Sequence, residues 1–265
     1  FDTVIAGDGE RAIFDALSPT APAIIDADDR ASPLFLQRGS LGELPPPARH
    51  LIDQPSYRFL IDGQPAASLI GQLGCPFGCT FCGGRNSASF RTIRTRPVAS
   101  IVSEVESLYR VYGYQAFFFL DDELNVTPAF MELLHALSSL QSRLGVDFRF
   151  RGLLKAELLT PTMAQQMRAT GFREVLSGFE SGDPRILVNM NKHATRDDNS
   201  RCVDIARQAG MRVKALMSLG HAGESLESIE ATRRWLLHVQ PEQFDATIIT
   251  VYPGTPLWEE RQVFP

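Results

Sequence analysis

Apolar segments of strand length alternate with amphipathic segments of helix length from Ala67 almost to the end of the chain. The apolar runs are continuous and do not alternate with polar residues, which is typical of strands buried on both faces of a parallel sheet. The pattern predicts six strands, at Ala67–Gly74, Gln115–Leu120, Val146–Arg151, Glu174–Gly178, Arg212–Leu219 and Ala246–Val251. It predicts helices between them, at Val98–Tyr112, Pro128–Leu144, Thr162–Thr170, Pro184–Met190, Arg196–Gly210 and Ser225–Val239.

Repeated strand–helix units favour an α/β fold in which helices cover a parallel sheet. The six units occupy about 185 residues, fewer than the roughly 250 residues of a complete eight-fold barrel. We therefore expect an open or partial (β/α)6 barrel of the TIM type over residues 67–260.

The first 66 residues do not show this repeated strand–helix pattern. A strand-like "TVIAG" at Thr3–Gly7 precedes a turn and a short amphipathic helix, which is expected at Arg11–Leu17. A proline-rich tract follows and predicts a linker at residues 41–66. Because the chain starts with Phe1 and reads as though it begins inside a domain, we expect a further segment upstream.

Composition narrows the class of protein. The chain has 265 residues, 44% of them hydrophobic, and a formal net charge of −5. A nucleic-acid-binding surface normally shows a basic excess, so nucleic acid is not an expected partner. No apolar run approaches the roughly 18 residues that a membrane span needs, and no basic-then-apolar leader is present. We expect a cytoplasmic protein with no membrane partner.

Glycines and polar side chains follow each of the six predicted strands. In parallel α/β folds the carboxyl ends of the strands meet at one rim, where ligands bind, so these segments are expected to converge. In strand order they are "CPFGCTFCGG", Asp121–Glu123, Arg151–Gly152, Gly178–Ser181, Gly220–Ser225 and Tyr252–Pro256.

Three of the four cysteines lie in the glycine-rich loop after the first strand, at Cys75, Cys79 and Cys82. A disulfide is disfavoured because three is an odd number and a reducing compartment is expected. A structural zinc site needs a fourth ligand, and Cys202 fits better as a small buried hydrophobe in a helix. Iron–sulfur ligation suits the three thiolates and would leave one iron of a four-iron cluster open.

The loop resembles the signature of the radical S-adenosylmethionine (SAM) superfamily: Cys75, Cys79 and Cys82 form Cys-x3-Cys-x2-Cys, with Phe81 before the last cysteine. Further segments are similar to the subgroup whose catalytic core follows a cobalamin-binding domain, namely "FFFLDDELNVTP", "RATGFREVLSGFESGDPRILVNMNK", "GHAGESLESIEAT" and "ITVYPGTPLWE". "AGDGERAIFDAL" and "LGELPPPARHLID" are similar to the end of that upstream domain. The resemblance implies that residues 1–40 are the remnant of a Rossmann-like domain.

The resemblance also implies the chemistry. The three cysteines would ligate a [4Fe–4S] cluster whose open iron binds SAM, and the reduced cluster would cleave SAM to a 5′-deoxyadenosyl radical that abstracts hydrogen from substrate. The acidic residues would lie near the SAM ammonium, Arg151 would neutralise the SAM carboxylate, Glu180 and Ser181 would bind its ribose or amino group, and glycines and an aromatic ring would contact adenine. The implied cofactor-binding residues are Phe81, Gly83, Asp121, Asp122, Glu123, Arg151, Glu180, Ser181, Gly220, Gly223 and Tyr252.

Several alternatives stay open. Cobalamin-dependent methylation of an unactivated carbon is the first expectation, and rearrangement, epimerisation, cyclisation or decarboxylation without cobalamin is the second, because the sequence lacks the Asp-x-His-x-x-Gly motif that ligates cobalt. Non-enzymatic alternatives are an electron carrier and a zinc-binding module. Expected partners are a small-molecule substrate and an electron donor such as flavodoxin or ferredoxin. The roles of His221, Lys192 and the basic residues from Arg85 to Arg96 are undetermined.

Overall fold

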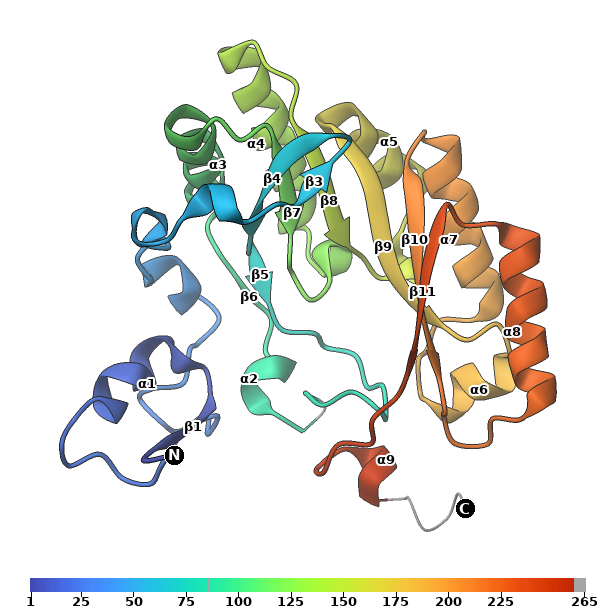
Figure 1. Ribbon diagram of the computed structural model, residues 1–265, viewed down its shortest axis with the longest axis horizontal. Coiled ribbons are helices and arrows are strands. Elements are labelled where there is room, and N and C mark those ends of the chain that lie inside the picture. Colours follow the sequence, from blue (N-terminus) through green and yellow to red (C-terminus); the bar gives the residue numbers. More distant parts are fainter. Residues whose placement is uncertain (85, 260–265) are drawn as a thin grey trace.

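The computed structural model describes residues 1–84 and 86–259. Its main sheet curls into a partial barrel with the strand order β11-β10-β9-β8-β7-β4-β3 (Figure 1). Neighbours from β4 to β11 pair in parallel, and β3 is antiparallel to β4. The expected six-stranded parallel arrangement is therefore confirmed. The strands are β3 (Leu60–Ile61), β4 (Gln64–Leu69), β7 (Ala116–Phe119), β8 (Arg149–Leu153), β9 (Phe172–Glu180), β10 (Arg212–Leu219) and β11 (Gln243–Ile248).

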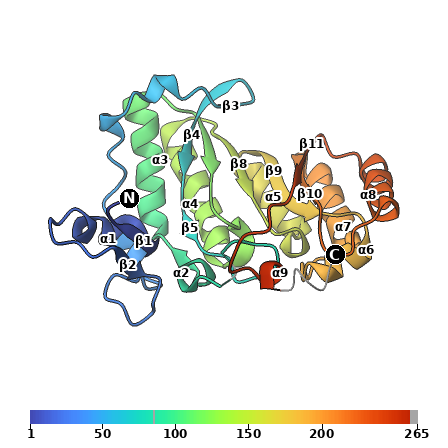
Figure 2. The same cartoon turned by 60° about the horizontal axis from the view of Figure 1, so that its bottom comes forward.

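Helices cover the outer face of the curled sheet in both views (Figures 1 and 2). The longer ones are α3 (Val98–Tyr112), α4 (Ala129–Leu144), α5 (Pro161–Thr170), α7 (Arg196–Gln208) and α8 (Leu226–Val239). Between sheet and helices lies a core of phenylalanine rings that includes Phe117, Phe119, Phe150 and Phe172. Because side chains alternate along a strand, Phe118 points to the opposite, inner face. The run Phe117–Phe119 is thus core packing with one inward ring.

The third parallel strand differs from its predicted bounds, and this moves Arg151. The sequence pattern ended that strand at Arg151, whereas β8 continues to Leu153. Arg151 pairs in register with Phe118 of β7 and Glu174 of β9. Arg151 is the middle residue of β8, so it lies within the strand and not after it. The expectation that Arg151 follows its strand at the ligand-binding rim is wrong.

The amino-terminal residues form a small separate layer beside the barrel (Figure 2). Strands β1 (Val4–Gly7) and β2 (Ile24–Ala27) pair in parallel, and α1 (Gly9–Ala16) packs on them around Ala12 and Ile25. We call residues 1–34 the N-terminal unit. The proline-rich tract then makes three short 3-10 turns, at Ser40–Glu43, Arg49–Leu51 and Gln54–Ser56. β4 begins at Gln64, before the expected Ala67.

The first barrel unit carries an extra hairpin. β5 (Gln72–Leu73) pairs antiparallel with β6 (Arg94–Thr95), and the short helix α2 (Ala88–Arg91) lies between them in sequence. The hairpin closes around residues 74–93, which include the three clustered cysteines. Two further short helices, α6 (Pro184–Asn189) and α9 (Pro256–Glu259), lie at the same end of the barrel as α2 (Figure 1). Among the described residues, no helix is long and apolar enough to cross a bilayer.

The phenylalanine core makes a testable prediction about stability. Phe172 is fully buried, and its ring lies against Phe119, Phe130 and Phe150. Phe172→Ala should lower the free energy of unfolding by about 3–5 kcal/mol, because it removes the ring and leaves a cavity. Phe244→Ala, on a ring that is 57% exposed, serves as the control. Chemical denaturation measures both, and a loss below about 1 kcal/mol for Phe172→Ala would contradict this account of the core.

Candidate active site

The cysteine loop lies at the carboxyl-terminal rim and is held by segments distant in sequence. Cys75, Cys79 and Cys82 are partly buried free thiols. Its backbone bonds to α2, to the segment after α6 and to α9. These contacts are Cys75 N–H to Phe90 O at 2.8 Å, Thr80 N–H to Met190 O at 2.9 Å, Asn191 Nδ2 to Gly78 O at 2.9 Å, and Leu257 N–H to Thr80 O at 3.1 Å.

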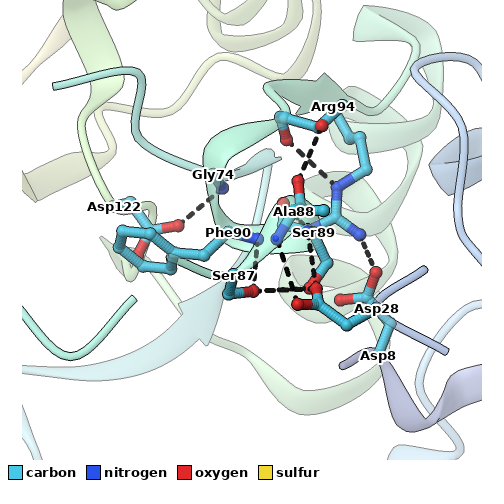
Figure 3. Close-up of polar contacts among 10 residues, drawn as sticks. Asp8, Asp28, Gly74, Ser87, Ala88, Ser89, Phe90, Arg94 and Asp122 are labelled. Carbon is cyan, nitrogen blue, oxygen red and sulfur yellow. Dashed lines mark hydrogen bonds and ion pairs between the residues drawn. The ribbon is translucent and has the colours of Figure 1, made fainter. Parts of the chain in front are cut away.

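Two of the three rim acids fix the start of this loop. Asp121 Oδ1 accepts the Gly71 N–H at 2.7 Å. Asp122 Oδ2 accepts the Gly74 N–H at 2.6 Å, as Figure 3 shows. Burial raises the pKa of Asp121 to about 7, although the Gly71 N–H acts in the opposite direction. Gly74 has φ +94°, and a Cβ there would lie 2.3 Å from a backbone oxygen, so this position requires glycine. Asp121 and Asp122 therefore support the loop.

Glu123 differs from its two neighbours because one of its oxygens is free. Its Oε2 is buried without a hydrogen-bond partner in the described part of the chain. Burial raises the pKa of Glu123 to about 7, although the charges of Lys192 and Lys155 lower it. A buried carboxylate oxygen without a donor is costly, so this atom suits a ligand that brings one.

Lys155 is a rim residue that the sequence analysis missed. It follows β8 by two residues, its side chain is 2% exposed, and its Nζ donates to Lys192 O at 3.2 Å. The same Nζ lies 3.3 Å from Glu157 Oε1 and 4.4 Å from the centroid of the Phe77 ring in the cysteine loop. Inward positions alternate along β8, so Arg151 and Leu153 predict Lys155 as the next inward residue. The misplaced strand end hid this signal.

Lys192 and Glu180 form a buried ion pair beside the cysteines. Lys192 Nζ lies 3.2 Å from Glu180 Oε1, and the two side chains are 7% and 14% exposed. Burial would lower the pKa of Lys192, but the charges of Glu180, Cys79 and Glu123 raise it above its ordinary value. Glu180 has φ +63°, a strained conformation typical of functional sites. A Cβ on Gly178 would lie 2.4 Å from Glu180 Oε1, so the missing side chain makes room for the pair.

His221 links this pair to the cysteine loop. Ser218 Oγ donates to Glu180 Oε2 at 2.8 Å and lies 2.6 Å from His221 Nε2. With the serine proton given to Glu180, we assign the Nε2–H tautomer of a neutral imidazole, which donates to Ser218. Burial lowers the pKa of His221, in keeping with the neutral form. Its ring packs edge-on to Phe81 with centroids 4.9 Å apart. His221 thus contacts Phe81 directly and Glu180 through Ser218.

The remaining predicted residues divide into two groups. Ser181 is fully buried, and its hydroxyl forms hydrogen bonds with Thr232 Oγ1 and the Asp183 N–H, both at 3.1 Å. It therefore links the start of α6 to α8. At the rim, Gly220 and Gly223 have φ +94° and +77° in the turn after β10. Tyr252 is 56% exposed, and a Cβ on Gly83 would lie 3.8 Å from its ring. Tyr252 is therefore adjacent to the cysteine loop.

Arg151 has partners away from the cysteine loop. Its Nε lies 2.9 Å from Glu174 Oε1, and its guanidinium stacks over Phe59 and Phe118 with distances of 5.4 and 5.0 Å to the ring centroids. The basic residues after the loop also have structural partners. Arg91 donates to Pro76 O at 2.6 Å, and Arg96 donates to Ile70 O and Glu104. Arg85 lies outside the described residues.

The thiols differ in their surroundings. Burial raises the pKa of Cys75 to about 11 and also raises the pKa of Cys79. Cys202, a residue of α7, is fully buried in the core, as expected. In residues 1–84 and 86–259, no three His, Cys, Asp or Glu side chains converge closely enough to hold one metal ion. A cluster makes a different demand, because each thiolate binds a separate iron.

Comparison with known proteins places this chain in a family. A model described as the Radical SAM superfamily matches residues 69–236. An uncharacterized methyltransferase of Pyrococcus horikoshii is 28% identical over 83% of this chain and 47% of its own length. The bacteriochlorophyllide d C-12(1)-methyltransferase of Chlorobaculum tepidum is 28% identical over 78% of this chain and 46% of its own. The chain thus spans about half the length of these two relatives.

A solved structure shares the fold. It is the radical S-adenosylmethionine methyltransferase TsrM from Kitasatospora setae, with cobalamin and a [4Fe–4S] cluster bound. The TM-score is 0.67 at 22% sequence identity, and the match covers 74% of this chain and 36% of that chain. The partial barrel described above is therefore the same barrel type.

The buried pair of Lys192 and Glu180 supports a second prediction. Lys192→Met should lower the free energy of unfolding by about 3–5 kcal/mol, because it leaves Glu180 buried without its cation. Adding Glu180→Gln should recover much of that loss. Arg233→Met, which breaks an exposed pair with Glu230, should cost at most about 1 kcal/mol. Urea unfolding of the metal-free protein measures all three variants, and equal losses for Lys192→Met and Arg233→Met would refute the pairing.

Proposed function

Because this chain belongs to the radical SAM superfamily, we propose that it binds a [4Fe–4S] cluster and SAM and methylates an unactivated carbon of a small-molecule substrate. The observation that carries the proposal is the position of the Cys-x3-Cys-x2-Cys loop. It lies at the carboxyl-terminal rim of the barrel, beside buried acidic and basic side chains that would suit the charged end of SAM.

Cys75, Cys79 and Cys82 would hold the cluster, and three protein ligands leave one iron open for SAM. When bound, the cluster supplies the electron that cleaves SAM to methionine and a 5′-deoxyadenosyl radical. The residues around it fix the loop: Asp122 holds Gly74, and the edge contact with His221 orients Phe81. Partial burial of the thiols limits the access of water.

The free oxygen of Glu123 would accept a hydrogen bond from the SAM ammonium group. Lys155 and Lys192 are the cations beside it, and we assign the SAM carboxylate to them in place of Arg151, whose partners lie deeper in the barrel. The opposite charges favour this orientation in a partly buried site. Asp121 and Asp122 contribute indirectly, by placing the backbone that precedes Cys75.

The nucleoside end of SAM would lie across the later strands. Glu180 is held by Lys192 and Ser218 at the end of β9, where it would accept from a ribose hydroxyl. The turn at Gly220 and Gly223 exposes backbone to adenine, and Tyr252 would form one wall beside Gly83. Ser181 would act only through packing.

The methylation part of the proposal draws on the relatives' printed names, two of which are methyltransferases. We further propose that residues 1–40 are the end of a Rossmann-like domain, residues 41–66 a linker whose last residues also form β3 and the start of β4, and residues 67–260 the catalytic core, with cobalamin as the methyl carrier. An electron donor such as flavodoxin or ferredoxin would reduce the cluster. A reducing cytoplasm suits free, cluster-ligating cysteines.

Cluster chemistry gives the third prediction. After anaerobic reconstitution the protein should bind four irons and, with a strong reductant, convert SAM to 5′-deoxyadenosine. Cys79→Ala should abolish this product, whereas Cys202→Ala should retain it because Cys202 lies in the apolar core. Iron analysis and chromatography of the nucleoside report the outcome. Zinc uptake alone, or undiminished cleavage by Cys79→Ala, would overturn the enzyme assignment.

Cobalamin uptake gives the fourth prediction and separates methylation from other radical reactions. The full-length protein should take up one equivalent of hydroxocobalamin that survives gel filtration, and a methyl group should pass from labelled SAM to substrate. Absorbance spectra and mass spectrometry measure these two results. If 5′-deoxyadenosine forms but no cobalamin is retained, methylation fails and the reaction is a cobalamin-independent rearrangement, epimerisation, cyclisation or decarboxylation.

A further inference from the structure

The N-terminal unit reaches the cysteine loop through two carboxylates. Asp8 follows β1 and Asp28 follows β2, so both lie at the carboxyl ends of paired parallel strands. Each contacts the stretch from Ser87 to Arg94, which begins five residues after Cys82 (Figure 3). The function proposed above gives neither aspartate a role.

Asp28 caps α2 from outside the helix. Its carboxylate accepts two backbone N–H groups and two hydroxyls at the start of that helix. The bonds come from Ser89 Oγ at 2.5 Å, Ser89 N–H at 2.7 Å, Ser87 Oγ at 2.9 Å and Ala88 N–H at 3.0 Å. Burial would raise the pKa of Asp28, but these bonds outweigh it and hold the pKa below its ordinary value. The carboxylate is therefore ionised and fully engaged at neutral pH.

Asp8 neutralises a buried cation at the other end of the same stretch. Arg94 is 2% exposed, and Asp8 is its ion-pair partner. The guanidinium also donates to Ser89 O at 3.1 Å and Thr92 O at 3.2 Å. Arg94 of β6 therefore binds one carbonyl of α2 and the carbonyl that directly follows this helix. An unpaired arginine at this burial would be strongly unfavourable, so its position depends on Asp8.

The capped helix in turn supports both ends of the cysteine loop. Ser87 Oγ accepts the Phe90 N–H at 3.1 Å, and Phe90 O accepts the Cys75 N–H at 2.8 Å. The Phe90 ring packs directly on Gly84, where an added Cβ would lie 2.3 Å from the ring. A path of contacts therefore runs from Asp28 through Phe90 to the residues that flank the three thiols.

A cavity also lies between the unit and the barrel. The apolar core of the unit is separate from that of the barrel, and a cavity of about 600 Å³ lies between α1 and the end of β4, lined by Phe14, Leu44, Ile70 and Leu73 among others. The polar contacts of Asp8 and Asp28 join the unit to the stretch from Ser87 to Arg94.

We propose that Asp8 and Asp28 are positioning residues for the cysteine loop, so that the N-terminal unit forms part of the cluster site. The functional consequence, retention of the cluster, rests on the proposed function. The contacts themselves do not depend on it. Loss of either carboxylate should loosen α2 and residues 74–84 while the barrel strands stay intact.

Hydrogen exchange on the metal-free full chain tests the contacts directly. Asp28→Asn and Asp8→Asn should each speed exchange of the Phe90 and Cys75 amides by roughly tenfold or more, the equivalent of about 1.4 kcal/mol. The Val175 amide in β9 reports global stability and should keep its rate. Asp29→Asn is the matched control, since the side chain of this exposed neighbour accepts the Ala31 N–H within the N-terminal unit and has no contact with α2 among the described residues. Unchanged rates at Phe90 and Cys75, or equal acceleration at Val175, would overturn the proposal.

Ser89→Ala provides a milder change from the loop side, should the aspartate variants fold poorly. It removes one hydroxyl donor to Asp28, so its effect and that of Asp28→Asn should be less than additive in a double-mutant cycle. Full additivity would show that the two residues act independently and would contradict the proposed path.

Cluster retention tests the consequence. After reconstitution, Asp28→Asn should lose iron to a chelator several-fold faster than the unchanged protein, and Asp29→Asn should match it; equal rates for all three would count against the positioning role. If the unchanged protein takes up no cluster, the proposed function fails, whereas the exchange rates of the metal-free chain still decide whether Asp8 and Asp28 position the loop.

Discussion

The site depends on holding a glycine-rich loop whose backbone finds its partners far away in the sequence. Cys75 bonds to α2, Thr80 to the residue after α6 and to α9, and Gly74 to Asp122 after β7. Partly buried backbone groups without partners are costly, so the loop adopts this conformation only when those elements are in place. Folding of the barrel and formation of the cysteine site are therefore coupled.

Charge compensation is the second constraint at the rim. Glu180, Lys192, Lys155 and Glu123 are brought together by three different strands, and their charges lower the cost of burying one another. One oxygen of Glu123 is left without a donor in the described structure. Such incomplete pairing is what a site for a zwitterionic ligand requires, and in the radical SAM superfamily that ligand is SAM.

Several features could be predicted from the sequence because they depend on local patterns. The bounds of α3 and β10 agree with the apolar periodicity, and the Cys-x3-Cys-x2-Cys spacing identified the family that the comparison confirmed. Burial of Cys202 followed from its place on the apolar side of α7. The order of six parallel strands followed from repeated strand–helix units, since crossover connections leave few alternatives.

Only the tertiary structure decided which charged side chains lie at the rim beside the cysteines. A small error in the predicted end of β8 placed Arg151 at the rim, where the structure has Lys155, because successive strand residues differ in height and face. Asp121 and Glu123 stand two residues apart, yet Asp121 accepts a backbone N–H, whereas Glu123 keeps one carboxylate oxygen without a donor in the described structure. The contact of Asp28 with Ser89 spans 61 positions. The sequence determines the elements through local periodicity, whereas these pairings depend on distances that exist only after the strands and the N-terminal unit have packed.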